Sequence, residues 1–356
     1  MNIYINGRFL TQKTTGVQRV AEEIVKKIDD LLVASELEKD LKVILLVPKN
    51  TMKDLKLKRI KIKKIGILKG HLWEQLILPI YTRNHMLINF CNTGPIYKKN
   101  QIVMIHDAAV CTYPEGFSKA FLLWYRFLYS KLSKSAKKII TVSNFSKREL
   151  VSYFPSMKSK IDVIYNGIDH IWERKFEESI LEKHQLTSGE YILAVSSMNP
   201  NKNFKVIAEA MTNMTSLKAQ VVIVGGKQSK VFANETMESD QNIIWTGYVS
   251  DEELVTLYKN AKVFLFPSIY EGFGLPPLEA MAMGCPVIAS NAACIPEICG
   301  EHVTYFDPTN ANDLAEKIQL FDQMKILNSK KGAQQFVKKY NWNDAAKKLL
   351  EHIKML

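Results

Sequence analysis

Short runs of apolar, mostly β-branched residues alternate along the chain with longer amphipathic stretches. Such apolar runs predict buried strands, and the amphipathic stretches predict the helices that cross over between parallel strands. In the first half, strands are expected at 2–5, 42–47, 86–90, 101–105, 138–142 and 160–164, and helices at 16–32, 117–135 and 143–153. The pattern therefore predicts an α/β fold.

The same pattern starts afresh in the second half. Strands are expected there at 191–195, 220–224, 242–245, 263–266 and 286–289, and helices at 202–211, 251–260, 277–283 and 312–321. The polar stretch 173–190 between the two sets is typical of a connection between sheets, so we predict a first domain over 1–172 and a second over 173–338. Two doubly wound parallel sheets are expected to bind a ligand beyond their strand ends, in a cleft between the domains.

The composition excludes a disordered chain, a collagen and a small disulfide-rich scaffold. The chain has 356 residues, 47% of them hydrophobic and 24% charged, which is enough to bury a large core. Its longest apolar runs, 43–47 and 76–80, are far shorter than the ~20 residues that cross a bilayer, and the first residues lack the features of a signal peptide. We therefore expect a cytoplasmic protein.

Charge is unevenly distributed along the chain. The net charge is +12, but residues 1–160 hold 29 Lys and Arg against 12 Asp and Glu, a balance of +17, and the remainder is mildly acidic. A basic half favours polyanions such as phospholipid headgroups or nucleic acid. Because no nucleic-acid-binding module is recognisable, the preferred partner is an anionic membrane surface, and no nucleic acid is expected.

Two basic stretches could carry this binding. The densest alternates lysines and one arginine with leucines and isoleucines: Lys53, Lys56, Lys58, Arg59, Lys61, Lys63, Lys64 and Lys69. It fits a polyanion-binding surface and equally an edge strand protected by lysines. The second, 119–138, is basic and aromatic with helical periodicity, and fits a helix at a membrane interface or, preferably, one packed on its own sheet.

The most specific segment covers residues 266–289 and reads FPSIYEGFGLPPLEAMAMGCPVIA. Gly272 and Gly274 allow the backbone to approach a ligand closely, and the prolines after Leu275 suit the first turn of a helix, whose free amides favour a phosphate. Glu271 is expected in the loop and Glu279 about two turns along the helix. Carboxylates at these places are suited to accept hydrogen bonds from sugar hydroxyls.

This segment resembles the E-x7-E motif of retaining glycosyltransferases with the GT-B fold, in particular those of family 4. Further blocks resemble the family in order: TTGVQR (14–19), IHD (105–107), TVSNFSKRE (141–149), VIYNGID (163–169), YILAVSSMNPNKN (191–203) and TGYVSDEE (246–253). The resemblance thus extends over nearly the whole chain. It implies two facing Rossmann-like domains with a cleft between them, the first binding the acceptor and the second the nucleotide sugar, and a C-terminal helix over 339–356 that packs back on the first domain.

The resemblance also implies roles for residues of the second domain. Glu279 is expected to hold the ribose hydroxyls of the donor, and Glu271 to bind the donor sugar. Lys202 is expected to bind the diphosphate together with the amides of Gly274 and Leu275. Such fixed donors stabilise the charge that accumulates on a departing nucleoside diphosphate.

Other implied contacts come from both domains. His106 is expected to contact the donor sugar near the acceptor, and Gly16 to leave room beside the diphosphate. The remaining expected contacts are Gly272, Phe273 and Ser197 on the donor side and Asp107 and Arg19 on the acceptor side. Many members carry an arginine where this chain has Ser197 or Asn201, so Lys202 is expected to be the lone local cation.

The function implied is that of a retaining glycosyltransferase in bacterial surface-polysaccharide assembly, such as that of O-antigen and lipopolysaccharide. It would transfer a hexose, with mannose favoured, to a lipid-linked saccharide at the inner face of the cytoplasmic membrane. GDP-mannose is the preferred donor, with UDP-sugars next; no cofactor is expected. No metal is expected either, because the sequence has no Asp-x-Asp pair and no His/Cys cluster.

Two alternatives stay open. A nucleotide-sugar epimerase or hydrolase of the same fold would keep the donor residues but leave the basic half unexplained. A catalytically inactive, polyanion-binding scaffold is favoured by the missing arginine and opposed by the presence of Glu271, Glu279, Lys202 and His106.

Overall fold

The computed structural model describes residues 2–34, 41–195, 199–214, 220–226, 243–324 and 329–356. The chain forms two compact units, Met1–Gly167 with Asn341–Leu356 (unit 1) and Ile168–Tyr340 (unit 2). The divisions lie close to the predicted residues 172 and 338. Gly167 packs directly against the C-terminal segment of unit 1, because a Cβ atom at this position would lie 2.2 Å from the backbone nitrogen of Trp342.

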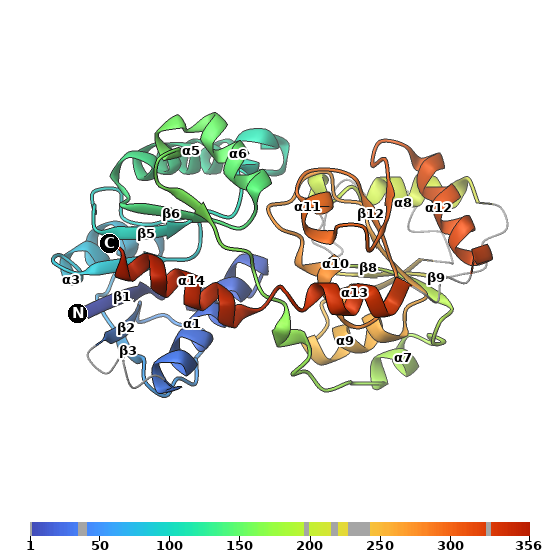
Figure 1. The fold of residues 1–356 in the computed structure, drawn as a ribbon, viewed down its shortest axis with the longest axis horizontal. Coiled ribbons are helices and arrows are strands. Elements are labelled where there is room, and N and C mark those ends of the chain that lie inside the picture. Colours follow the sequence, from blue (N-terminus) through green and yellow to red (C-terminus); the bar gives the residue numbers. More distant parts are fainter. Residues whose placement is uncertain (1, 35–40, 196–198, 215–219, 227–242, 325–328) are drawn as a thin grey trace. The chain divides into compact units, whose positions relative to one another are not determined.

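Unit 1 is built on a parallel sheet that, among the described residues, has seven strands in the order β3-β2-β1-β4-β5-β6-β7 (Figure 1). The strands are β1 (Asn2–Asn6), β2 (Lys42–Val47), β3 (Lys61–Lys64), β4 (Met86–Asn89), β5 (Gln101–Met104), β6 (Lys138–Thr141) and β7 (Ile161–Val163). The six predicted strands are confirmed to within two residues at each end. The lysine-rich run contributes β3, which pairs with β2 at the edge of the sheet, so its edge-strand interpretation is confirmed.

The helices of unit 1 include the three predicted ones and a C-terminal helix. The longer helices are α1 (Gly16–Ala34), α5 (Lys119–Ser135), α6 (Asn144–Tyr153) and α14 (Trp342–Lys354). The shorter ones are η1 (Arg8–Thr11), α2 (Gly70–Leu72), η3 (Trp73–Ile77), α3 (Leu78–Tyr81), α4 (Ala109–Thr112), η4 (Pro114–Gly116) and η5 (Pro155–Met157). Figure 1 shows α14 beside α1, with which it makes extensive contact. Leu128 and Leu132 of α5 are buried in the core, so this helix packs on its own sheet through one face.

Unit 2 repeats the plan with a parallel sheet of six described strands in the order β10-β9-β8-β11-β12-β13. They are β8 (Tyr191–Val195), β9 (Gln220–Val224), β10 (Ile243–Gly247), β11 (Val263–Phe266), β12 (Val287–Ser290) and β13 (Thr304–Phe306). The helices are η6 (Asp169–Ile171), α7 (Ser179–Lys183), η7 (Pro200–Lys202), α8 (Phe204–Thr212), α9 (Asp251–Asn260), α10 (Leu275–Ala282), α11 (Ile295–Cys299), α12 (Ala311–Met324) and α13 (Ser329–Val337). The five predicted strands and four predicted helices are all present, whereas β13, α7, α11 and α13 were not predicted.

Both sheets reverse their winding direction beside their first strand. The reversal lies between β1 and β4 in unit 1 and between β8 and β11 in unit 2. Loops that leave the carboxyl ends of such neighbouring strands diverge to opposite faces of the sheet and leave room for a ligand. The loops after these strands are therefore suited to form a ligand-binding site. Within the described part of the chain, no helix combines the length and apolar character needed to cross a membrane.

Candidate active site

In unit 2, the E-x7-E segment folds as the sequence predicted, from strand to glycine loop to helix. β11 ends at Phe266, and α10 begins at Leu275 after Gly274, whose φ of +89° is in the left-handed region that favours glycine. Prolines occupy the first turn of α10, where no intrahelical hydrogen bond is lost. The amides of this helix start follow the carboxyl end of β11, an arrangement suited to an anion.

The loop after β8 meets the loop after β11 through an ion pair. The side-chain nitrogen of Lys202 lies 2.5 Å from a carboxylate oxygen of Glu271, and both side chains are mostly buried. The structure therefore brings together the two residues assigned to the diphosphate and to the donor sugar.

Asn201 ties the same two loops together. Its side-chain amide donates to the carbonyl of Tyr270 at 2.9 Å, and its own carbonyl accepts from the amide of Ile269 at 2.9 Å. The residue that stands where many family members carry an arginine thus holds the Glu271 loop in place. Ser197, the other such position, lies outside the described residues.

Glu279 lies on the buried side of α10, where two side chains from other elements reach its carboxylate. The hydroxyl of Tyr258, on α9, donates to one oxygen at 3.2 Å, and Nε2 of His170, in η6, lies 3.4 Å from the other. Burial and the neighbouring carboxylate raise the pKa of Tyr258 well above its ordinary value, so its hydroxyl keeps its proton and remains a donor. Sequence reasoning missed both partners, since neither lies in a motif.

Gly272 and Phe273 connect the Glu271 loop to the helix, and both are buried. The ring of Phe273 packs edge-on against Tyr340, with 5.6 Å between ring centroids. This side chain therefore anchors the loop within unit 2, which leaves its backbone as the part suited to contact a donor.

In unit 1, His106 follows β5 and is 5% exposed. Its ring Nε2 lies 2.8 Å from the carbonyl oxygen of Phe90 and donates to it, which leaves Nδ1 as the acceptor in the neutral ring. Burial lowers the pKa of His106 to about 4, opposed in part by this hydrogen bond, so the imidazole is neutral near pH 7. Its backbone amide donates to the side chain of Asn92 at 2.8 Å.

The other predicted residues of unit 1 lie at helix starts. Asp107 accepts a hydrogen bond from the amide of Ala109 at 2.9 Å and so shapes the turn into α4. Gly16 is the first residue of α1, and a Cβ atom at this position would meet nothing within 4 Å. Arg19, one turn further, donates its amide to Thr15 at 2.9 Å. The space beside Gly16 is thus open within unit 1.

A buried polar network at the carboxyl ends of β1 and β4 was not predicted. Glu74 of η3 is fully buried and accepts from Asn6, Arg8 and Thr93 at 2.8–3.2 Å. Burial alone would raise the pKa of Glu74, but the charge of Arg8 and these hydrogen bonds outweigh it and lower the pKa below its usual value. A glutamate within a mostly apolar stretch was the available signal in the sequence.

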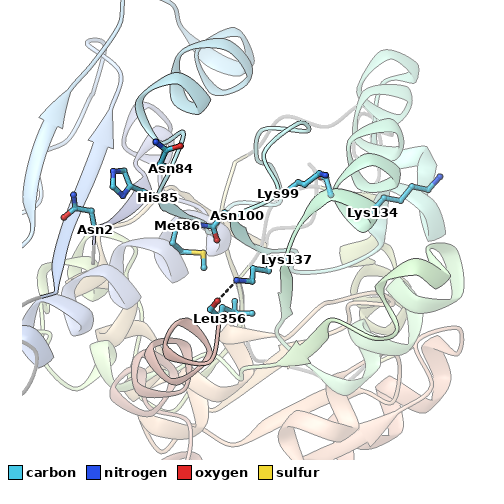
Figure 2. Close-up of a pocket in the computed structure, with 10 residues that line it drawn as sticks. Asn2, Asn84, His85, Met86, Lys99, Asn100, Lys134, Lys137 and Leu356 are labelled. Carbon is cyan, nitrogen blue, oxygen red and sulfur yellow. Dashed lines mark hydrogen bonds between the residues drawn. The ribbon is translucent and has the colours of Figure 1, made fainter.

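The pocket in Figure 2 lies elsewhere on unit 1, with a volume of about 600 Å³. Its lining includes Asn2 and Met86, the first residues of β1 and β4, and Lys137, just before β6. These residues mark the amino ends of parallel strands, whereas His106 follows the carboxyl end of β5. The pocket therefore lies at the opposite end of the strands from His106, and it is not part of the candidate site. Among the described residues, no group of three or more His, Cys, Asp or Glu side chains is arranged to hold a metal ion.

Comparison with known proteins identifies the family. A family model described as "Glycosyl transferases group 1" matches residues 176–339, and a model for "Glycosyltransferase Family 4" matches residues 85–171. The O-antigen chain mannosyltransferase B of Escherichia coli is 29% identical over 72% of this chain and 70% of its own length. The O-antigen chain mannosyltransferase RfbU of Salmonella typhimurium is 28% identical over 64% of this chain and 62% of its own length.

Solved structures share the fold across almost the full chain. Sucrose-phosphate synthase from Thermosynechococcus elongatus matches with a TM-score of 0.76 and 18% identity, over 99% of this chain and 98% of its own. Anabaena HepE, in complex with UDP and glucose, matches with a TM-score of 0.73 and 18% identity over the whole of both chains. With its two Rossmann-like units, its E-x7-E segment and these matches, the chain belongs to the family 4 glycosyltransferases of the GT-B fold.

Proposed function

We propose that this glycosyltransferase transfers a hexose, with mannose favoured, from a nucleoside diphosphate to a hydroxyl of a lipid-linked saccharide, with retention of anomeric configuration. The observation that carries the proposal is the meeting of Lys202 and Glu271 at the carboxyl ends of β8 and β11, just before the helix start at Gly274. The relatives' names, O-antigen mannosyltransferases, favour GDP-mannose and surface-polysaccharide assembly. The UDP bound to HepE makes UDP-sugars the second choice.

In this proposal, residues of unit 2 bind each part of the donor: the diphosphate, the ribose and the sugar. Lys202 and the amides of Gly274 and Leu275 bind the diphosphate and stabilise the charge that builds up on it as it leaves. Glu279, oriented by Tyr258 and His170, accepts hydrogen bonds from the ribose hydroxyls. Released from Lys202, the carboxylate of Glu271 accepts hydrogen bonds from hydroxyls of the donor sugar.

The reaction itself exchanges one C–O bond for another. The acceptor hydroxyl oxygen bonds to the anomeric carbon on the face from which the diphosphate departs. The bond from that carbon to the phosphate oxygen breaks, its electron pair stays on the oxygen, and the hydroxyl proton passes to a phosphate oxygen. In unit 1, we assign Gly16 to the space beside the diphosphate and His106, with its neutral ring, to a sugar hydroxyl rather than to proton donation.

Two further features belong to the proposal. The ammonium of Lys202 and the helix amides take the place of a divalent ion, so transfer proceeds without metal. The basic unit 1 holds the enzyme at the inner face of the cytoplasmic membrane, where a lipid-linked acceptor would be found.

Nucleotide binding tests the donor site directly. Thermal unfolding of the protein is followed with GDP, UDP, ADP and dTDP, beside a Glu279→Ala variant. Selective stabilisation by one nucleotide that is lost in the variant supports the proposal and names the donor nucleotide. Stabilisation by none of them, in folded protein, contradicts it and favours an inactive scaffold.

Transfer tests the reaction. The protein is incubated with the selected nucleotide sugar, a lipid-linked saccharide and EDTA, and the anomeric configuration of the product is read by NMR. Glycosylated acceptor with retained configuration supports the proposal. Release of free sugar or of an epimer that does not need the acceptor indicates the hydrolase or epimerase instead.

A further inference from the structure

One helical segment of unit 1 carries its apolar side chains on its outer face. The segment runs from Gly70 to Tyr81 through α2, η3 and α3. Leu72, Leu76 and Ile80 recur at every fourth position, share one face, and are 62%, 54% and 72% exposed. We call these three residues the leucine face.

The inner side of the segment is fixed, so the leucine face cannot rotate inward. Trp73 is fully buried, and its indole nitrogen donates to the carbonyl of Ile65 at 2.9 Å. Glu74 is fully buried and paired with Arg8 at 3.2 Å. Turning the helix would expose Trp73 and leave the charge of Arg8 buried without its partner, which is strongly unfavourable.

Lysines lie beside the leucine face. Every residue of the edge strand β3 is exposed, including Lys61, Lys63 and Lys64. The side-chain nitrogen of Lys63 lies 5.7 Å from the ring centroid of Tyr81, at the end of the segment. Gly66, in the loop between them, packs so closely that a Cβ atom would lie 2.6 Å from Ile77. The edge strand and the helix therefore contribute to one continuous surface.

These lysines are available to a partner. Within the described ranges, no acidic side chain lies at ion-pair distance from Lys61, Lys63, Lys64 or Lys69. Ile67, between Lys64 and Lys69, is also exposed. The surface thus combines large apolar side chains with unpaired positive charge.

We propose that the leucine face inserts into the headgroup–acyl boundary of an anionic phospholipid bilayer, with Lys61, Lys63, Lys64 and Lys69 against the lipid phosphates. Apolar side chains on one face of a helix, flanked by lysines, suit this interface because burial and charge act together. The inference deepens the proposed function, on which it rests for a lipid-linked acceptor, by assigning membrane contact to the 70–81 segment. Charge complementarity favours lipid over a second copy of this chain, since two copies would bring their lysines together.

Vesicle binding tests the inference with matched variants. Co-sedimentation is measured with vesicles of phosphatidylcholine alone and of phosphatidylcholine with phosphatidylglycerol, without nucleotide. We expect the wild-type protein to bind the anionic vesicles, and the Leu72→Ser/Leu76→Ser variant to bind them at least about tenfold more weakly. The control is Val33→Ser/Leu320→Ser, which removes two exposed apolar side chains outside this surface and is expected to bind like wild type.

A charge variant separates the two contributions. Lys61→Gln/Lys63→Gln/Lys64→Gln is expected to weaken binding about a hundredfold at low salt and to reduce its salt dependence. Equal binding of the serine double variant and the wild type overturns the inference, as does failure of the wild type to bind anionic vesicles. A leucine-dependent dimer in lipid-free solution, seen by light scattering, also overturns it.

The proposed function is tested separately by nucleotide stabilisation of the same samples. If GDP or UDP stabilises the protein but the protein does not bind anionic vesicles, membrane insertion is refuted and the donor site is not. If the protein binds vesicles through the leucine face but no nucleotide stabilises it, the donor site is refuted and membrane insertion is not.

Discussion

The side-chain nitrogen of Lys202 lies 2.5 Å from a carboxylate oxygen of Glu271, although 69 positions separate the two residues in the chain. They meet because β8 and β11 are neighbours in the sheet and each residue follows its strand. Without donor, the proposed diphosphate-binding cation is therefore neutralised by the carboxylate proposed to bind the sugar. In the proposed donor site a diphosphate has to share or replace that partner, so we expect the pair to tune donor affinity.

Removing the carboxylate charge should strengthen nucleotide binding. We expect Glu271→Gln to tighten GDP binding several-fold, because Lys202 is released and one negative charge near the phosphates is lost. Sugar transfer by the same variant should fall at least about a hundredfold, since the carboxylate no longer binds the donor sugar. Titration calorimetry and initial rates check the two effects.

The matched control for this change is Lys202→Gln, which should weaken GDP binding about tenfold or more. If Glu271→Gln weakened GDP binding as well, the competition between Glu271 and the diphosphate would be disproved.

Tyr258 should act on the ribose through Glu279. In Tyr258→Phe, one carboxylate oxygen loses its hydrogen-bond donor, so we expect GDP to bind about three- to tenfold more weakly. For 2′-deoxy-GDP, the difference in affinity between the variant and the wild type should be smaller. This nucleotide lacks one of the ribose hydroxyls that are proposed to donate hydrogen bonds to Glu279.

Tyr191→Phe provides the control, since it removes another buried tyrosine hydroxyl of unit 2, one that donates to the carbonyl of Leu257 at 2.7 Å. It should lower stability without distinguishing the two nucleotides. Equal losses for both nucleotides in Tyr258→Phe would indicate a purely structural role.

Stability should depend on pH through His106. Its pKa is about 4 in the folded protein and near 6.5 when the chain is unfolded, so the unfolded state binds a proton more readily. The contribution of the neutral His106 ring to the free energy of unfolding is complete above pH 6.5 and is lost as the pH falls from 6.5 towards 4. Between pH 7 and pH 5 we expect a loss of about 2 kcal/mol from this residue.

Urea unfolding of the wild type and of His106→Gln, at both pH values, isolates this contribution. The stability difference between the two proteins should shrink by about 2 kcal/mol at pH 5, because only the wild type titrates there. A difference that stays constant with pH would show that His106 is not held in the neutral form.

The Arg8–Glu74 pair should matter far more to stability than a surface pair. We expect Glu74→Gln to lower the free energy of unfolding by about 3–5 kcal/mol, because it leaves the guanidinium of Arg8 buried without a counter-charge. Lys205→Gln, which removes one partner of an exposed pair on α8, should cost less than about 1 kcal/mol. Urea titrations measure both, and similar costs would contradict the buried-pair argument.

Features that lie close together in the sequence were predictable. The strands over 42–47, 191–195 and 263–266 were predicted with the bounds the structure shows, because a buried parallel strand is apolar along its whole length. α10 was predicted over 277–283 and begins two residues earlier, at Leu275, because the glycine, the prolines and the helix pattern lie within a few residues of one another. The family resemblance rested on blocks of the same local kind, and the family and fold are confirmed.

Pairings between distant residues could not be predicted in this way. His170 and Tyr258 reach Glu279 from separate elements, and no spacing in the chain encodes their meeting. Asn201 stood out only as a missing arginine, yet the structure gives it a hydrogen bond that holds the Glu271 loop. Strand order decides which loops become neighbours, and it depends on long-range packing rather than on the pattern within any one strand.

The sequence by itself determined most of the strands and the longer helices, the α/β class, the strand–loop–helix arrangement of the E-x7-E segment and the basic character of the first half. Only the tertiary structure decided which side of the 70–81 segment faces the core. Its inner side holds Trp73 and Glu74, and its outer side holds Leu76, although hydropathy alone would bury the leucine and expose the glutamate. The reason is physical: burial of Glu74 is tolerated only because Arg8, Asn6 and Thr93 meet it in the folded chain, and that compensation exists in three dimensions alone.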